Sequence, residues 1–278
     1  MMTLRDEATG FGRWCFDRAV AAGEDWHCDR KRNPFSALQY QFWNLLVLRN
    51  VRDLIGMNRL RRGTTGAAPI APEQIRWFQS LGVPLFEGYG MTETTGVASL
   101  NSAKREKVGT VGEALPGTEV RIADNGEVLV RGDHVFAGYW RKPEKTTEDI
   151  RDGWLHTGDI AYMDERGFVF IKDRIRDVVV TGGFNVYPND VEAVLGQHPN
   201  ISECVVFGLP DQKWGEAVHA AVELRGMPET SEVELIDFVK SRLGSVKTPK
   251  RIHITGQLPR SSVGKILRRE AKIQFSDS

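Results

Sequence analysis

The spacing of hydrophobic and polar residues predicts a helical first part of the chain that leads into a sheet. Helices are predicted over residues 14–22 and 38–55, on either side of a polar block at 24–34. A further helix is expected to begin near Pro72, which suits the first turn of a helix, and a short strand to follow at 81–87. A helix feeding a strand that ends in Gly-Tyr-Gly indicates a parallel α/β sheet, whose ligands bind at the carboxyl ends of the strands.

The middle of the chain is β-rich, with alternating apolar residues on both sides of turn residues. The first predicted hairpin covers residues 120–130 and has a type I′ turn at Asn125 and Gly126. Two more hairpins are predicted over 160–171 and 178–187.

The last part of the chain has the order of a small α+β domain. Ser231 and Glu234 form a predicted capping box ahead of a helix, and a block of charge at 172–177 indicates a domain boundary. The remaining predicted elements are a helix at 188–196, strands at 204–207, 217–224 and 251–254, and a short final helix. The predicted fold class is therefore α/β followed by α+β.

Composition and charge narrow the classes of protein that need to be considered. The chain has 278 residues with 41% hydrophobic content, enough for roughly two compact units. Equal numbers of basic and acidic residues, 37 of each, remove the electrostatic reason to expect a nucleic-acid binder. Three cysteines without a C-x-x-C pair argue against a disulfide scaffold or a zinc knuckle. We expect neither a signal peptide nor a transmembrane helix, and a cytoplasmic location with peripheral membrane association left open.

Several familiar motifs fail on a single residue. A P-loop would need glycine at position 259, where Pro259 stands, and a dinucleotide fingerprint would need glycine at position 93, where Glu93 stands. The six histidines form no H-E-x-x-H pair, and no serine lies in a G-x-S-x-G elbow. Zinc hydrolases and serine hydrolases therefore have little support.

A set of polar residues on glycine-rich turns is the strongest chemical signal. Each such turn taken alone is more often structural than functional. Together they offer a hydroxyl and a carboxylate for phosphate and Mg²⁺, a carboxylate for ribose hydroxyls, and two cations for phosphate charge. This is the chemistry of a nucleotide monophosphate site, and its members are Thr92, Glu93, Asp159, Arg174 and Lys265.

Five segments around these residues closely resemble, in order, the core motifs of the adenylate-forming superfamily of acyl-CoA synthetases. They are GYGMTETTG (88–96), GEVLVRGDHVFAGYW (126–140), DGWLHTGDIAYMDERGFVFIKDR (152–174), TGGFNVYPNDVE (181–192) and LPRSSVGKILRRE (258–270). The segment 66–90 is similar to the long-chain fatty-acid CoA ligase branch. The resemblance implies the last part of a large AMP-binding domain over 1–172 and a complete small C-terminal domain over 173–278.

The resemblance also implies a two-step reaction, in which a fatty acid and MgATP give acyl-AMP and pyrophosphate, and CoA then displaces AMP. Thr92 would hold the α-phosphate, Glu93 the Mg²⁺, Asp159 the ribose with Arg174 nearby, and Lys265 would neutralise charge during adenylation. The remaining implied positions are the adenine pocket (Gly66, Ala67, Ala68, Pro69, Glu87, Gly88, Tyr89, Gly90), the hinge (Arg176) and the CoA-step loop (Gly182, Gly183, Phe184).

The sequence departs from the family in one respect. Members carry a Ser/Thr/Gly-rich phosphate loop with a lysine ahead of these motifs, and residues 63–66 imitate it without the Pro-Lys-Gly that should follow. We therefore expect weak or no activity of the chain alone, and an upstream complementary chain as one partner besides fatty acid, ATP and CoA. Two alternatives stay open: a non-catalytic nucleotide- or partner-binding fragment, and an acyl-AMP ligase with another acceptor.

Overall fold

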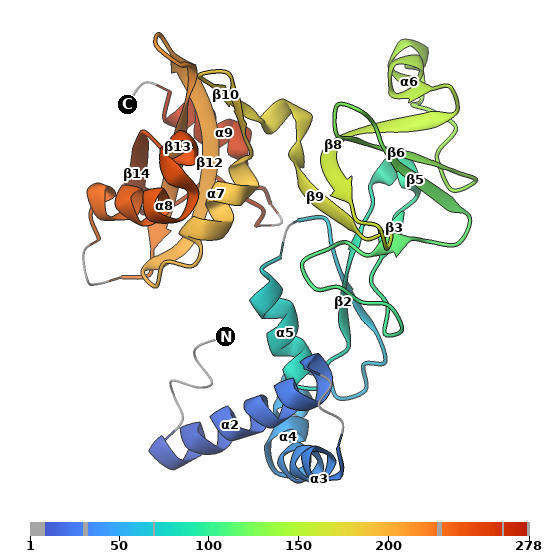
Figure 1. Ribbon diagram of the computed structural model, residues 1–278, viewed down its shortest axis with the longest axis vertical. Helices are drawn as coiled ribbons and strands as arrows, with labels where there is room; N and C mark the ends of the chain where they lie inside the picture. Colours follow the sequence, from blue (N-terminus) through green and yellow to red (C-terminus); the bar gives the residue numbers. More distant parts are fainter. Residues whose placement is uncertain (1–8, 30–32, 69, 227–229, 263, 277–278) are drawn as a thin grey trace. The chain divides into compact units, whose positions relative to one another are not determined.

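The computed structural model describes residues 9–29, 33–68, 70–226, 230–262 and 264–276. Its internal contacts group the chain into two compact units (Figure 1). The first unit contains most of the chain up to Phe170, and the second contains Ile171–Ser278 with the short stretches Ile122–Val128 and Thr157–Tyr162. The mixture of helices, a parallel strand pair and antiparallel hairpins confirms the predicted fold class.

The first unit begins with helices that share a small apolar core around Leu48, Leu81 and Val83. The predicted helices are present, and part of the polar block between them is also helical. Helix α2 continues directly into a π-helical turn, and Asn33 caps α3 by accepting the N–H of Ser36 at 2.9 Å. The elements are α2 (Gly10–Gly23), η1 (Glu24–Cys28), α3 (Pro34–Trp43), η2 (Asn44–Leu48) and α4 (Arg49–Leu54).

A βαβ unit follows, in which β1 and β2 lie side by side as parallel strands joined through α5. The expected parallel pair is confirmed, although β3 and β4 extend the sheet in antiparallel fashion. The strand predicted at 81–87 starts too early, because Gly82, at φ +83°, and the bond from Val83 N–H to the Phe78 carbonyl end α5 in a turn. The elements are β1 (Gly63–Thr65), α5 (Pro72–Ser80), β2 (Leu85–Tyr89), η3 (Thr92–Thr94), β3 (Ser99–Leu100) and β4 (Glu113–Ala114).

A second sheet has the strand order β5-β6-β8-β7, with β9 paired to β8. Both predicted hairpins are present, but the type I′ turn is wrong. Gly126 alone adopts the left-handed region, at φ +85°, while its N–H donates to the Ala123 carbonyl and the Ala123 N–H donates to that of Glu127. This is a type I turn closed by a glycine bulge. The elements are β5 (Thr118–Ile122), β6 (Glu127–Gly132), α6 (Pro143–Asp149), β7 (Ile150–Arg151), β8 (Trp154–Met163) and β9 (Val169–Arg174).

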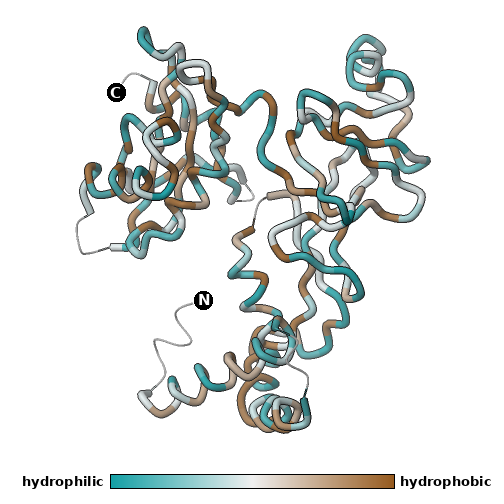
Figure 2. The backbone as a smooth tube through the Cα atoms, in the orientation of Figure 1, coloured by the Kyte–Doolittle hydropathy of each residue, from teal (hydrophilic) through white to brown (hydrophobic). Residues whose placement is uncertain are grey.

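The second unit is built on a five-stranded sheet with the order β11-β10-β13-β12 and β14 paired to β13. Alternate residues of β12 and β13 point to opposite faces, which gives two apolar layers. One layer packs on α7 and α8, the other on α9 and Leu258, and hydrophobic stretches follow the strands (Figure 2). The elements are η4 (Ile175–Asp177), β10 (Val179–Thr181), β11 (Phe184–Val186), α7 (Pro188–Leu195), β12 (Ile201–Asp211), β13 (Gly215–Leu224), α8 (Glu232–Lys247), β14 (Arg251–Thr255) and α9 (Arg268–Gln274).

The predicted order of elements in this unit is confirmed, and the third hairpin has both turn glycines, Gly182 and Gly183, at positive φ. Of the predicted capping box, the structure shows the bond in which the Ser231 hydroxyl accepts the N–H of Glu234 at 3.2 Å. Within the described part of the chain, no helix is both long and apolar enough to cross a bilayer.

Candidate functional site

The first group of predicted site residues lies where β1 and β2 end. Because the two strands are parallel, the segment after Thr65 and the segment ending at Tyr89 leave the sheet at the same edge. The chains approach closely there, since a Cβ atom at Gly66 would come within 2.7 Å of the Gly88 carbonyl oxygen. Ala67 takes a left-handed conformation, at φ +65°, and Ala68 follows it. The structure thus brings the predicted adenine-pocket segments together; Pro69 lies outside the described residues.

Close packing within the chain explains two of the site glycines. A Cβ atom at Gly90 would meet the carbonyl oxygen of Gly96 at 1.7 Å, and one at Gly88 would come within 3.0 Å of the Ser99 carbonyl. Side chains at either position would force the backbones apart. Glycine is therefore required here by the fold, and its presence does not by itself indicate a ligand.

Glu87 lies in the middle of β2 and has a perturbed pKa. The residue is 9% exposed. Burial raises the pKa of the Glu87 carboxyl from 4.5 to about 7. Near neutral pH this carboxyl can accept or donate a hydrogen bond, which suits contact with a polar heterocycle.

The turn after β2 presents Thr92 and Glu93. Thr94 is buried beneath them, and its hydroxyl bonds the carbonyls of Met91 and Gly96 at 3.0 Å each, which fixes the 3₁₀ turn. The Thr92 side chain is exposed and that of Glu93 is half-buried.

The Glu93 carboxylate accepts a hydrogen bond from the Tyr139 hydroxyl at 2.8 Å. Burial, together with Glu93 and Asp149, raises the pKa of Tyr139 well above its usual range, so the phenol keeps its proton. Tyr139 and Asp149 were not among the predicted site residues. The described residues contain no cluster of three or more His, Cys, Asp or Glu side chains that could cage a metal ion. One carboxylate does fit Mg²⁺, which is usually held by one or two carboxylates together with substrate phosphates and water.

A second group of predicted residues lies on β8 and β9. Asp159 lies 3.7 Å from the Arg174 guanidinium, so the structure brings this pair together. The glycine-rich turn expected before Asp159 is wrong, because Thr157, Gly158 and Asp159 lie within strand β8. Thr157 donates its hydroxyl to the Val128 carbonyl at 2.8 Å, and the Gly158 N–H donates to the buried Glu127 carboxylate at 3.0 Å. A carboxylate on a strand beside a guanidinium is suited to binding neighbouring hydroxyl groups.

Lys265 lies on a tight loop just before α9. Ser261 N–H donates to the Lys265 carbonyl at 2.8 Å, and the Lys265 N–H donates to the Ser261 hydroxyl at 3.2 Å. Gly264 completes the turn at φ +81°, and the Lys265 side chain is exposed. Lys265 is thus an exposed cation on this loop.

Three residues beyond Lys265, the Arg268 guanidinium joins this loop to the start of the unit. It contacts Asp177 and Glu192 at 2.9 Å each, Asn189 at 3.2 Å and Asp173 at 3.3 Å. Burial alone would lower the pKa of Arg268, but the carboxylates of Glu192 and Asp173 raise the pKa by more than burial lowers it. The guanidinium therefore stays charged. The sequence did not reveal this network, because Asp173 and Asp177 were interpreted only as part of a charged boundary and Glu192 lies 76 residues from Arg268.

The other predicted positions of this unit are exposed. Arg176, the predicted hinge residue, lies in η4 with a side chain that is 74% exposed, and its guanidinium lies 3.9 Å from Asp177, a member of the Arg268 network. Gly182 lies against Trp214, since a Cβ atom there would come within 2.9 Å of the indole, and Phe184 is exposed.

Comparison with known proteins gives two separate matches, in order along the chain. Residues 19–140 match the family model described as AMP-binding enzyme. Residues 190–265 match the model described as AMP-binding enzyme C-terminal domain.

The similar curated proteins are CoA ligases of more than one substrate class. A long-chain-fatty-acid–CoA ligase of Escherichia coli O157:H7 is 38% identical over 255 residues, which is 86% of this chain and 45% of the ligase. A feruloyl-CoA synthase of an Amycolatopsis species is 36% identical over 231 residues, 79% of this chain and 47% of the synthase. The chain thus spans about half the length of the curated relatives it matches.

Solved structures extend the similarity to three dimensions. ATP-bound MatB from Rhodopseudomonas palustris superposes with a TM-score of 0.75 at 33% identity, covering 85% of this chain and 50% of MatB. The amide bond synthetase McbA from Marinactinospora thermotolerans gives a TM-score of 0.72 at 31% identity, covering 84% of this chain and 51% of McbA.

Proposed function

The chain belongs to the adenylate-forming AMP-binding enzymes, and from that premise we propose that it carries nucleotide-binding and catalytic residues of a long-chain fatty-acyl-CoA ligase. The reaction would join a fatty acid to AMP with release of pyrophosphate, and then transfer the acyl group to the CoA thiol. The observation that carries the proposal is the placement of the motif's polar residues: Glu93 lies on a turn fixed by buried Thr94, and Asp159 in strand β8 lies 3.7 Å from Arg174 at the end of β9.

In this proposal each group of residues recognises a different part of the nucleotide. Residues 66–69 and 87–90 would bind adenine, with Tyr89 against the base, and Thr92 would hold the α-phosphate. Asp159 would accept hydrogen bonds from the ribose hydroxyls, and Arg174 would orient that carboxylate. Mg²⁺ bound at Glu93 would neutralise phosphate charge. Lys265 would stabilise the negative charge that develops as pyrophosphate leaves, an effect worth roughly 10² to 10³ in rate.

We also propose that the small domain begins at Asp173 and rotates about Arg176 between the two half-reactions. The support is the exposure of Arg176 in a short 3₁₀ turn at the start of this unit. Gly182, Gly183 and Phe184 would enter the site for the thiol step, since a hairpin tip with two left-handed glycines and an exposed phenyl ring is free to approach a ligand.

A complementary segment is the proposed partner of the N-terminal helices. More of their large apolar side chains are exposed than is usual on the surface of a monomeric protein. The family fold is about twice as long as this chain, so we propose that its remaining part covers this face. The exposed large apolar residues of these helices are Phe11, Trp14, Phe35, Leu38, Phe42, Leu45, Leu46 and Leu54.

We propose a reducing, cytoplasmic setting, since the three cysteines are unpaired.

A second candidate function differs in the acid or in the acceptor. Feruloyl-CoA synthase among the relatives supports an aromatic acid, and an amide bond synthetase among the similar structures supports an acceptor other than CoA. Both candidates share acyl-AMP formation, so nucleotide binding tests them together.

Isothermal calorimetry on the chain tests the proposal. AMP is expected to bind, and ATP to gain little over AMP, because the sequence lacks the loop that would cradle the β- and γ-phosphates. Asp159→Asn should weaken AMP binding about tenfold, the value of one hydrogen bond to a charged group. Asp124→Asn, an exposed residue of the β5–β6 turn, is the matched control. A chain that binds neither nucleotide, or an Asp159→Asn variant that binds AMP normally, contradicts the proposal.

A further inference from the structure

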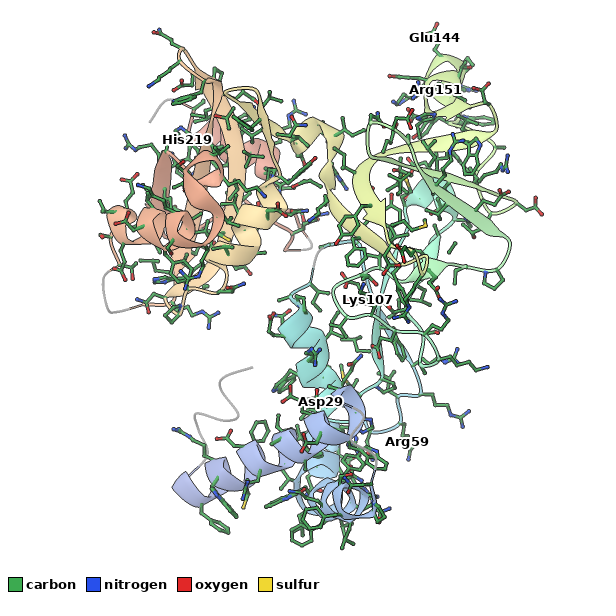
Figure 3. All side chains as sticks on the ribbon, viewed as in Figure 1. Asp29, Arg59, Lys107, Glu144, Arg151 and His219 are labelled. Atoms are coloured by element: carbon green, nitrogen blue, oxygen red, sulfur yellow. The ribbon has the colours of Figure 1, made fainter. Side chains whose placement is uncertain are left out.

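The Tyr139 hydroxyl lies between two carboxylates that come from different elements. It is 2.8 Å from Glu93 Oε1, on the turn after β2, and 2.9 Å from Asp149 Oδ2, at the end of α6. The other oxygen of Asp149 accepts from Lys145 Nζ at 2.7 Å. Glu144 and Arg151, labelled in Figure 3, mark the two ends of the short segment that carries Asp149. A phenol has one proton, so it can donate to one of the two carboxylates at a time.

The loop that carries Tyr139 is also fastened to the Glu93 turn by its backbone. The Phe136 N–H donates to the Glu93 carbonyl at 2.8 Å, and the Thr95 hydroxyl donates to the His134 carbonyl at 2.6 Å. The Phe136 and Tyr139 rings meet edge to face with centroids 4.8 Å apart. These contacts tie the loop to the turn, so Tyr139 is held close to Glu93.

The base of the loop is fixed independently of Glu93. Tyr139 N–H donates to the Thr146 hydroxyl at 2.9 Å, which in turn donates to the Lys142 carbonyl at 3.0 Å. Gly138 lies so close to Thr146 that a Cβ atom would come within 2.6 Å of its methyl group. These contacts fix the backbone at Tyr139 without involving the Glu93 carboxylate.

Among the described residues, Tyr139 is the one side chain with a hydrogen bond to the Glu93 carboxylate. Removing that bond would leave a half-buried carboxylate free to rotate about its side-chain torsions. Asp149 is the alternative acceptor for the same proton, so it competes with Glu93 for the phenol.

We propose that Tyr139 is a positioning residue that holds the Glu93 carboxylate in the orientation needed for the Mg²⁺ of a bound nucleotide. The role in Mg²⁺ binding rests on the proposed function, whereas the contact between Tyr139 and Glu93 does not. Divalent-cation sites lose affinity when the partners that orient their ligands are removed, typically by 10- to 100-fold.

The geometry is tested on the chain without any ligand, by amide hydrogen exchange. Tyr139→Phe keeps the ring and removes the hydroxyl, so exchange in the peptide containing Thr92–Thr94 should accelerate about tenfold, as expected for loss of a hydrogen bond to a charged group. Asp149→Asn weakens the competing acceptor and should not accelerate exchange there. Tyr162→Phe, which removes a hydroxyl from strand β8, is the matched control. Unchanged exchange in Tyr139→Phe overturns the inference.

The consequence is tested by the dissociation constant of ATP measured in Mg²⁺ and in EDTA. The ratio of the two constants should shrink by about 10-fold in Tyr139→Phe, approaching the ratio for Glu93→Gln, while ATP binding in EDTA stays at the parent value. Normal ATP binding with an unchanged ratio overturns this inference alone. A parent chain that binds no nucleotide overturns the proposed function and the role in Mg²⁺ binding, whereas the exchange result still decides whether Tyr139 holds Glu93.

Discussion

The N-terminal helices and the C-terminal unit bury their apolar side chains to very different extents. In the C-terminal unit, both faces of the sheet are covered, and Leu195, Val206 and Val222 are fully buried. In the helices, a small core around Leu48 is buried, while Leu45 in the same turn of helix is 65% exposed. The comparison teaches that one unit completes its own core, whereas the other presents an apolar surface suited to a further segment of the family fold.

The largest expected effect comes from breaking the Arg268 network inside the self-sufficient unit. Arg268→Met would leave the buried Asp173 carboxylate and the half-buried Asp177 and Glu192 carboxylates without their cation, which should lower the free energy of unfolding by about 3–5 kcal/mol. Urea unfolding, followed by hydrogen exchange in β12 and β13, measures the loss. The adjacent exposed Arg269→Met is the control. A loss below about 1 kcal/mol would mean that the network is not needed for this unit.

A paired truncation compares the two surfaces directly. Leu195→Ala removes a buried side chain from the C-terminal core and should cost about 2–5 kcal/mol in unfolding free energy, whereas Leu45→Ala should cost less than about 0.5 kcal/mol. Both variants are measured by urea unfolding under the same conditions. Equal losses would show that the helices bury Leu45 in solution, for example by self-association, and the contrast between the units would fail.

A change of pH should act on the first unit through Glu87. Its folded pKa, about 7, lies above the ordinary value of 4.5, so the folded state binds the extra proton between these values. Stability is therefore full below about pH 4.5, falls as pH rises towards 7, and stays lower above it. The partly solvated carboxyl should contribute on the order of 1–2 kcal/mol between pH 5 and pH 8.

Glu87→Gln should remove that dependence, and Glu73→Gln, at an exposed position of α5, should keep it. The measurement is the urea midpoint of the first unit at pH 5 and at pH 8. Identical pH slopes in the parent chain and in Glu87→Gln would show that this carboxyl ionises normally in the folded chain.

Local sequence signals predicted most of the fold, and they failed where tertiary contacts decide the outcome. The Gly182–Gly183 turn and the α7 and α8 helices follow from turn residues and apolar periodicity. The sequence could not show that apolar Leu81 and Val83 belong to a helix-ending turn, because buried turns and buried strands share the same residue types. Nor could Asn125 reveal that it avoids the left-handed conformation, which a bulge at Gly126 makes unnecessary.

The candidate site shows the same division. Thr92, Glu93, Asp159 and Lys265 could be proposed from the motifs because their hydroxyl, carboxylate and ammonium groups can be interpreted as ligands one by one. Tyr139 and Arg268 lie in two of the same motifs, but their contacts could not be predicted, because their partners are distant in sequence: Tyr139 lies 46 residues from Glu93, and Arg268 lies 95 residues from Asp173. Candidates for the chemistry follow from residue type, whereas the contacts that orient side chains required the fold.

The central claim is that this chain holds family catalytic residues but needs the remainder of the fold to use them. The most direct measurement is ATP–pyrophosphate exchange with a long-chain fatty acid, for the chain alone and for a chimera that joins it to the part of the Escherichia coli relative that it does not span. The account predicts no appreciable exchange by the chain alone, clear exchange by the chimera, and a loss of roughly 10² to 10³ in the chimera with Lys265→Ala. Thioester formation from supplied acyl-AMP should be spared in that variant. Robust exchange by the chain alone, or exchange in the chimera that is undiminished by Lys265→Ala, would contradict the account.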